Sequence, residues 1–155
     1  MIKMSYNNVK IYKMSLADFE KIRDILTTDF DDFWEVKTFE DELKSENSYY
    51  LVAEFNSEIV GYAGMKIVLD EADIMNIVTK KDARNFGIAS AIFEQLINVA
   101  NSKGLHKLTL EVDENNFPAI HLYEKFGFKR IAIRKNYYSN SHTAIIMQLT
   151  LNSAN

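Results

Sequence analysis

The segment Arg84-Asn85-Phe86-Gly87-Ile88-Ala89 joins a predicted strand, Ala72–Thr79, to a predicted helix that begins at Ile88 and ends at Lys103-Gly104. A strand that passes through a glycine turn into a helix points several backbone N–H groups at one place, and the helix dipole adds partial positive charge there. Such a turn suits a phosphate group. Gly87 lacks the Cβ that would hold a phosphate away from the backbone, and Ala89 is small enough for the helix start to pack closely.

Three nearby cations strengthen this interpretation: Lys80, Lys81 and Arg84. The segment is not a Walker A loop, because no Gly-Lys-Ser/Thr follows, and it is not a dinucleotide-binding Gly-x-Gly-x-x-Gly turn. Taken alone, the pattern is equally compatible with a left-handed glycine in an ordinary strand-to-helix turn. Both interpretations stay open at this point.

The rest of the chain predicts an α/β fold of the order β-α-α-β-β-β-α-β-α-β-β, with a mixed sheet and helices packed on its faces. The predicted strands are Val9–Lys13, Ser48–Phe55, Ile59–Val68, Ala72–Thr79, Leu105–Val112, Phe128–Tyr137 and Thr143–Leu151. The predicted helices begin at Ser15, Thr38, Ile88 and Pro118. We expect one domain over residues 1–155, with a frayed tail at 152–155.

The few glycines have specific predicted roles. Gly61 and Gly64, inside a predicted strand, suggest a bulge or a close approach of another backbone. Gly104 and Gly127 follow helical patterns and predict helix ends. Ser15-Leu16-Ala17-Asp18 has the spacing of a capping box, which predicts a helix start.

Composition excludes several classes of protein. The 155 residues are 47% hydrophobic and 26% charged, which is ordinary globular usage. A net charge of −4 argues against capture of nucleic acid by a basic surface. The absence of cysteine excludes disulfides, thiolate metal sites and cysteine nucleophiles, and three scattered histidines lack the spacing of metal ligands. With no signal-peptide or membrane-helix pattern, we expect a cytoplasmic protein without membrane or direct nucleic-acid contact.

A second group of residues follows the long helix. Glu111 lies at the end of an apolar strand, where a carboxylate is out of place unless it is paired or functional. Tyr123 falls three residues after Ile120 on one face of a short predicted helix. In isolation, a surface charge at a strand end and a core aromatic with a satisfied hydroxyl explain the two residues better than a functional role does.

The segments acquire more meaning in combination. The motifs in question are Arg84-x-x-Gly87-x-Ala89, Leu110-Glu111-Val112, Asn116, Leu122-Tyr123-Glu124 and Gly127-Phe128, together with Val68–Ala72, Asn76-Ile77, Ile133–Tyr138 and Ala144–Met147. This combination resembles the GNAT family of acetyl-CoA-dependent N-acetyltransferases. Within that family it is similar to the RimI-type ribosomal-protein alanine N-acetyltransferases, most strongly from about residue 65 to residue 148.

The resemblance implies a fold and a cofactor site. The fold would be a mixed, mostly antiparallel sheet of about six to seven strands flanked by about four helices. The cofactor would be acetyl-CoA, with its pantetheine arm paired to the backbone of Ile77, Val78 and Thr79. Its pyrophosphate would be held by the turn and helix start, and its thioester end would be near Asn116. The implied residues of that turn and helix start are Arg84, Asn85, Phe86, Gly87, Ile88, Ala89 and Ser90.

The resemblance also implies the catalytic residues, with Glu111 as general base and Tyr123 as general acid. An α-amine has a pKa of about 7.7–8.0, so its neutral form costs about 1 kcal/mol near neutrality, whereas a lysine amine at about 10.4 costs about 4.6 kcal/mol. A modest base therefore suffices for an N-terminal amine. Tyrosine, at about 10, is close enough to a thiol, at about 8.5, to hand over a proton. Direct attack of the amine on the thioester needs no covalent intermediate.

On the acceptor side, the resemblance implies substrate contacts from Trp34, Tyr137 and Tyr138, although the two tyrosines could instead pack the final hairpin. The acidic loop Asp29–Glu35 could attract a cationic peptide N-terminus, or could be a solvated connection anchored by its aromatic residues. Asp113 stands where the family has a basic residue, and this makes the acceptor side more acidic. Lys80-Lys81 replaces a common Asp-Pro pair.

The leading hypothesis is an N-acetyltransferase that acts on the N-terminal α-amine of a protein, with a ribosomal protein as the first candidate. Two alternatives are an acetyltransferase for a small amine, such as a polyamine or amino sugar, and a non-catalytic acyl-CoA-binding module. The expected partners are acetyl-CoA and the amine acceptor. We expect a monomer or a weak homodimer.

Overall fold

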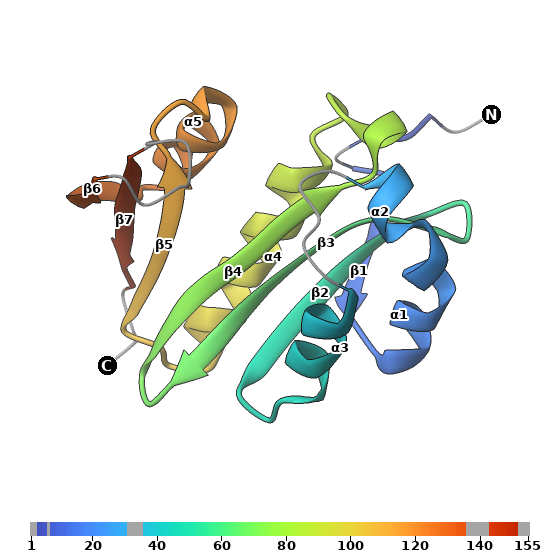
Figure 1. Ribbon diagram of the computed structural model, residues 1–155, viewed down its shortest axis with the longest axis horizontal. Coiled ribbons are helices and arrows are strands. Elements are labelled where there is room, and N and C mark those ends of the chain that lie inside the picture. The colour runs from blue at the N-terminus through green and yellow to red at the C-terminus, as the bar shows by residue number, and fades with distance from the viewer. Residues whose placement is uncertain (1–2, 6, 31–35, 136–142, 152–155) are drawn as a thin grey trace. The chain divides into compact units, whose positions relative to one another are not determined.

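The computed structural model describes residues 3–5, 7–30, 36–135 and 143–151, without the side chain of Asn76. Strands and helices follow one another in the predicted order, except that the first predicted helix is divided into two (Figure 1). The strands are β1 (Lys10–Lys13), β2 (Ser48–Phe55), β3 (Glu58–Val68), β4 (Glu71–Thr79), β5 (Lys107–Asp113), β6 (Lys129–Arg134) and β7 (Ala144–Thr150). The helices are α1 (Leu16–Ile22), α2 (Leu26–Asp29), α3 (Val36–Lys44), α4 (Ile88–Ser102) and α5 (Phe117–Lys125), with 3-10 helices at Arg23–Ile25 and Lys81–Ala83.

The predicted mixed sheet is confirmed, with the strand order β1-β2-β3-β4-β5-β7-β6. β4 and β5 pair in parallel, whereas β1–β2, β2–β3, β5–β7 and β6–β7 are antiparallel. Contacts divide the chain into two compact units, Met1–Ile67 with Met75–Val99, and Val68–Ile74 with Ala100–Asn155. A single domain over the whole chain stays a prediction, and its expected frayed tail lies outside the described residues.

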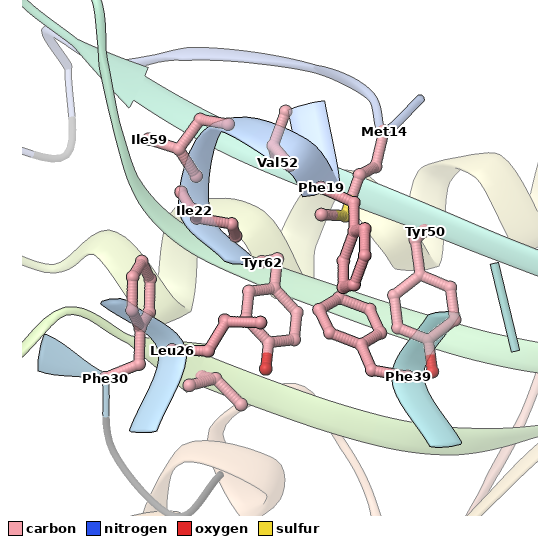
Figure 2. Close-up of a cluster of buried hydrophobic side chains, with 11 residues drawn as sticks. Met14, Phe19, Ile22, Leu26, Phe30, Phe39, Tyr50, Val52, Ile59 and Tyr62 are labelled. Atoms are coloured by element: carbon pink, nitrogen blue, oxygen red, sulfur yellow. The ribbon is translucent and has the colours of Figure 1, made fainter. Parts of the chain in front are cut away.

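The core of the first unit is aromatic. Phe39 of α3 stacks on Tyr62 of β3 with ring centroids 4.6 Å apart, and Phe19 of α1 meets Phe39 edge-on at 5.5 Å. Figure 2 shows these rings converging with Leu26 and Phe30 from the segment after α1. Helices α1 to α3 therefore bury their apolar sides against one face of this part of the sheet.

The first helical segment differs from the sequence-based expectation. Leu16, Phe19, Ile22 and Leu26 fit one continuous helical face, but the structure has a 3-10 turn between α1 and α2. Leu26 lies beyond that turn and is fully buried, whereas Leu16 is exposed. The predicted capping box is confirmed, because the Ser15 hydroxyl accepts the Asp18 N–H while the Asp18 carboxylate accepts the Ser15 N–H.

The prediction of a bulge or a close backbone approach is confirmed at Gly61, whereas Gly64 makes room for a side chain instead. The β2–β3 register shifts between Ala53 and Glu54, so a bulge lies close to Gly61. A Cβ on Gly64 would lie 2.2 Å from the Tyr50 ring, so the absence of a side chain there makes room for a buried aromatic.

The core of the second unit lies on one face of β5 and β7. Leu108, Leu110 and Val112 of β5 are buried, and so is Met147 of β7. α5 ends in a left-handed glycine, Gly127, after which the Phe128 N–H donates to the Tyr123 carbonyl. Because the alternate residues of β5 are polar, the other face of this part of the sheet carries the charged side chains. Within the described ranges, no helix has both the length and the apolar character needed to cross a membrane.

Candidate active site

The end of β4 is fixed in the first unit by neighbouring backbone. Val78 is buried, and the Lys80 N–H donates to the Val60 carbonyl at 2.8 Å. Phe30 also forms an isolated bridge with Lys80. The backbone of Ile77 and Thr79, predicted to pair with pantetheine, therefore belongs to a strand whose exit is held in place.

The turn after β4, residues 84–90, contains two residues with left-handed backbone, of which the sequence suggested only Gly87. Asn85 has φ 67° and Gly87 has φ 78°. α4 begins at Ile88, which is buried, and the Ala91 N–H donates to the Gly87 carbonyl at 3.0 Å, which closes the first helical turn. Phe86, between the two left-handed residues, is 45% exposed.

This geometry fits an anion. The N–H groups of the first turn of α4 have no carbonyl partners within the helix, and the dipole of a 15-residue helix adds positive potential at Gly87 to Ser90. Lys81 and Arg84 are exposed beside the turn, while Lys80 lies 3.8 Å from Glu58. The residues present are therefore suited to hold the diphosphate of a coenzyme A molecule.

Gly61 of β3 determines how closely α4 approaches the strands of the first unit. A Cβ at this position would lie 3.0 Å from Ile92 Cδ1 and 3.0 Å from the Val78 carbonyl oxygen. The first two turns of α4 therefore pack directly onto β3 backbone next to β4. This contact places the helix N-terminus at the end of the strand that carries the predicted pantetheine-binding residues.

In the second unit, Glu111 lies on the charged face of β5. Leu110 and Val112 point to the core, whereas the Glu111 side chain is 31% exposed. Thr109 lies on the same face and accepts a hydrogen bond from the Gln148 amide of β7 at 3.2 Å. We call the set Asp73, Thr109, Glu111, Gln148 and Arg134 the polar face.

Arg134, the last residue of β6, holds Glu111. Its Nη2 lies 2.9 Å from Glu111 Oε1. Strand β7 runs between the two, and its residue Ala144 pairs with Arg134 on one side and with Asp113 on the other. Because paired residues share a face, Arg134 and Glu111 lie on the same side of the sheet.

Asp73 of β4 provides a second carboxylate on the polar face. It pairs with Thr109 at the last residue pair of the β4–β5 ladder. Burial raises the pKa of Asp73, and the negative charges of Glu111 and then Glu71 raise it further. The influence of Glu111 on Asp73 shows that the two carboxylates are electrostatic neighbours.

α5 carries the other two predicted residues. Tyr123 is half-buried, with its ring centroid 6.2 Å from that of Phe128. Asn116 is the N-cap of α5, and its Oδ1 accepts the Ala119 N–H at 3.3 Å. This cap leaves the Asn116 amide nitrogen as the group that could donate to a cofactor, a role that stays a prediction.

Asp113 has a local role that sequence reasoning missed. Its Oδ1 accepts the Asn115 N–H at 2.8 Å, and its carbonyl accepts the Asn116 N–H at 2.9 Å. These bonds form an Asx turn that leads from β5 into α5. An acidic residue here therefore shapes the turn, whatever it contributes to the charge of the acceptor side.

The structure brings together Glu111, Arg134 and Asp73 in one unit, and residues 84–90 with the end of β4 in the other. Trp34, Tyr137 and Tyr138 lie outside the described residues, as does most of the acidic loop. Arg134 and Asp73 were missed as site residues. Alternation along β4 and β5 gives a signal for Asp73, since it falls two residues after Glu71 on the exposed face.

Comparison with known proteins supports the same interpretation. The sequence profile of the acetyltransferase (GNAT) family matches residues 19–128. A Bacillus subtilis protein, provisionally named a [ribosomal protein bS18]-alanine N-acetyltransferase, is 37% identical over 92% of this chain and 95% of its own length. The Escherichia coli K12 [ribosomal protein bS18]-alanine N-acetyltransferase is 36% identical over 76% of this chain and 81% of its own.

The fold agrees with the sequence match. The crystal structure of the ribosomal-protein-S18-alanine N-acetyltransferase from Escherichia coli superposes with a TM-score of 0.86, at 32% identity, over 95% of this chain and 96% of that one. The family profile spans both the turn before α4 and the segment from Glu111 to Tyr123. The chain therefore belongs to the GNAT family and is an N-acetyltransferase that uses acetyl-CoA.

Proposed function

We propose that the chain acetylates the N-terminal α-amine of a protein, with ribosomal protein bS18 of the same organism as the first acceptor. The observation that carries this proposal is the similarity along almost the whole chain, 37% identity over 92% of its length, to a relative whose name states that acceptor. The match in fold to the Escherichia coli enzyme supports it, since 95% of the chain is covered.

The proposed chemistry needs two proton movements. Acetyl-CoA, when bound, supplies an acetyl thioester. Glu111 takes one proton from the acceptor amine, whose nitrogen forms the new C–N bond, and the Tyr123 hydroxyl gives one proton to the sulfur as the C–S bond breaks. Glu111 then holds the extra proton and Tyr123 lacks one, so exchange with solvent restores both residues. The products are an N-acetylated chain and coenzyme A.

An α-amine suits this site better than a lysine amine. The α-amine costs only about 1 kcal/mol to deprotonate near neutrality, so the partly exposed carboxylate of Glu111 is a sufficient base. The Arg134 ion pair engages Oε1, and Oε2 is the atom that we propose receives the proton. The carboxylates of Asp73 and Glu111 together favour approach of a cationic N-terminus.

The experiment is a turnover assay that follows release of the coenzyme A thiol. The acceptors are a peptide with the N-terminal sequence of bS18, the same peptide with a blocked N-terminus and an internal lysine, and spermidine. We expect turnover with the first peptide and much less with the others. Preference for spermidine would favour the small-amine alternative, and binding of acetyl-CoA without turnover on any amine would favour a binding module.

The same assay tests the acid. Tyr123→Phe should lower kcat by about 10²–10⁴ with little change in acetyl-CoA affinity, because only the proton donor is lost. Tyr49→Phe, a partly buried tyrosine of β2, is the matched control and should leave kcat unchanged. Full activity of Tyr123→Phe would remove Tyr123 from the mechanism.

A further inference from the structure

The Arg134–Glu111 ion pair joins two strands that are not neighbours in the sheet. The two residues sit on β6 and β5, which are not neighbours, because β7 lies between them. Adjacent strands are about 4.8 Å apart, so the side chains reach across about 9.6 Å of sheet to meet at 2.9 Å.

Two features of the second unit make this reach possible. Ala144 of β7, which pairs with Arg134, is fully buried, and its methyl group is too short to stand between the two longer side chains. The β6–β7 register shifts between Arg130 and Ala132, so Ile131 is an extra residue in β6. Because of that bulge, Arg134 shares a face with Glu111, whereas Arg130, four residues earlier, pairs with Met147 of the opposite face.

The charged groups around Glu111 explain why a contact with Arg134 matters for the orientation of its carboxylate. Asp73 of β4 is a negative neighbour, and β5 itself places Lys107 and Asp113 on the same face. β7 contributes the uncharged residues Ala144, Ile146 and Gln148 to that face. If Arg134 were removed, the Glu111 carboxylate would lose its positive partner but keep its negative neighbour, Asp73. It could then change rotamer and turn away from that neighbour.

We propose that Arg134 is a positioning residue for acetyl transfer, and that its guanidinium fixes Glu111 in the orientation in which Oε2 accepts the proton of the acceptor amine. This inference rests on the proposed role of Glu111 as base. Stability alone does not explain the pair, since Arg134 is 51% exposed and exposed ion pairs contribute little to folding. Its value is orientation, and displacement of a reacting group by about 1 Å can cost about 100-fold in rate.

The test compares Arg134→Gln, Arg134→Lys and the matched control Arg130→Gln with the wild-type enzyme, using the bS18 peptide. We expect Arg134→Gln to lower kcat about 10-fold to 100-fold, with the KM for acetyl-CoA little changed. Arg134→Lys should restore part of the rate, and Arg130→Gln should behave as wild type.

A double-mutant cycle distinguishes action through Glu111 from any other effect. In a Glu111→Gln background, Arg134→Gln should cause less than about a twofold further loss, because the group that it positions is already gone. An equal fractional loss in both backgrounds, or a raised KM for acetyl-CoA with kcat unchanged in Arg134→Gln, would overturn the inference. If Glu111→Gln itself remained fully active, the proposed base would fail instead, so the two failures are separable.

Discussion

The turn before α4 is built from backbone groups, whereas the polar face of β5 is built from side chains. In the turn, two left-handed residues and the first N–H groups of α4 form the proposed anion site, which needs few side chains. On the polar face, the proposed chemistry depends on which side chains the strand register brings together across β4, β5, β7 and β6. A backbone site should tolerate loss of side chains and respond to backbone strain, and a side-chain site should do the opposite.

The largest effect is expected on the polar face. Glu111→Gln should lower kcat by about 10²–10⁴, because the amide cannot take a proton from the acceptor amine. Coenzyme A affinity, measured by isothermal titration calorimetry, should stay within about twofold, because we propose that the diphosphate is held by the turn before α4. Glu114→Gln, an exposed glutamate in the following turn, is the matched control. A kcat close to wild type in Glu111→Gln would mean that this face does not carry the chemistry.

A smaller effect is expected from strain in the turn. Gly87→Val places a β-branched residue at φ 78° and puts a side chain where a phosphate approaches the backbone. We expect about a tenfold weaker binding of coenzyme A, with kcat at saturating acetyl-CoA largely preserved. Gly104→Val is the control, since Gly104 has φ 72° beyond the other end of α4 with open space around it. Equal loss of binding in both variants would show that strain in α4, rather than the turn, determines affinity.

Side chains beside the turn should matter less. Lys81→Ala should weaken coenzyme A binding by about two- to threefold at physiological salt and by more at low salt, because an exposed charge is screened by ions. Calorimetry at two ionic strengths provides the measurement. A tenfold loss that did not depend on salt would mean that this region is also a side-chain site.

The turn could be predicted from sequence and much of the polar face could not, for a physical reason. Positive φ is energetically unfavourable for most residues other than glycine. The glycines at positions 87, 104 and 127 therefore indicate directly where the backbone is left-handed. Glu111 also stood out, as a charge in an apolar strand. Contact between Glu111 and Arg134 depends instead on the bulge at Ile131, and a strict alternation along β6 would put Arg130 and Arg134 on one face.

The same distinction applies to other residues. Asp113 was predicted to make the acceptor side more acidic. Its hydrogen bond with the Asn115 N–H in the next turn could not be predicted from the number of charges in the sequence. The roles of Trp34, Tyr137 and Tyr138 stay predictions. Capping of α1, the ends of α4 and α5 and the buried rings of the first unit follow from short-range patterns, which explains why the fold was more predictable than the site.

The smallest effect concerns stability. The pKa of Asp73 is raised in the folded protein from its ordinary value of 3.8, so the folded state binds its proton more tightly than the unfolded state does. At a pH above the raised pKa, ionised Asp73 therefore disfavours folding. This penalty disappears as the pH falls below about 3.8, where Asp73 is protonated in both the folded and the unfolded state. Asp73→Asn should slightly raise the Tm at pH 7 and leave it unchanged at pH 3, as followed by circular dichroism. A lower Tm at pH 7 would contradict this.

Gly61 offers a way to make a conditional enzyme. A methyl group there would press on the Val78 carbonyl and on Ile92, and the carbonyl cannot rotate away as a side chain could. Overpacking of this kind typically costs about 1–3 kcal/mol, a substantial part of the total of about 5–15 kcal/mol that holds a domain together. Gly61→Ala should therefore work in the cold and fail on warming, and cells that carry it would gain or lose the modification with a change of growth temperature alone.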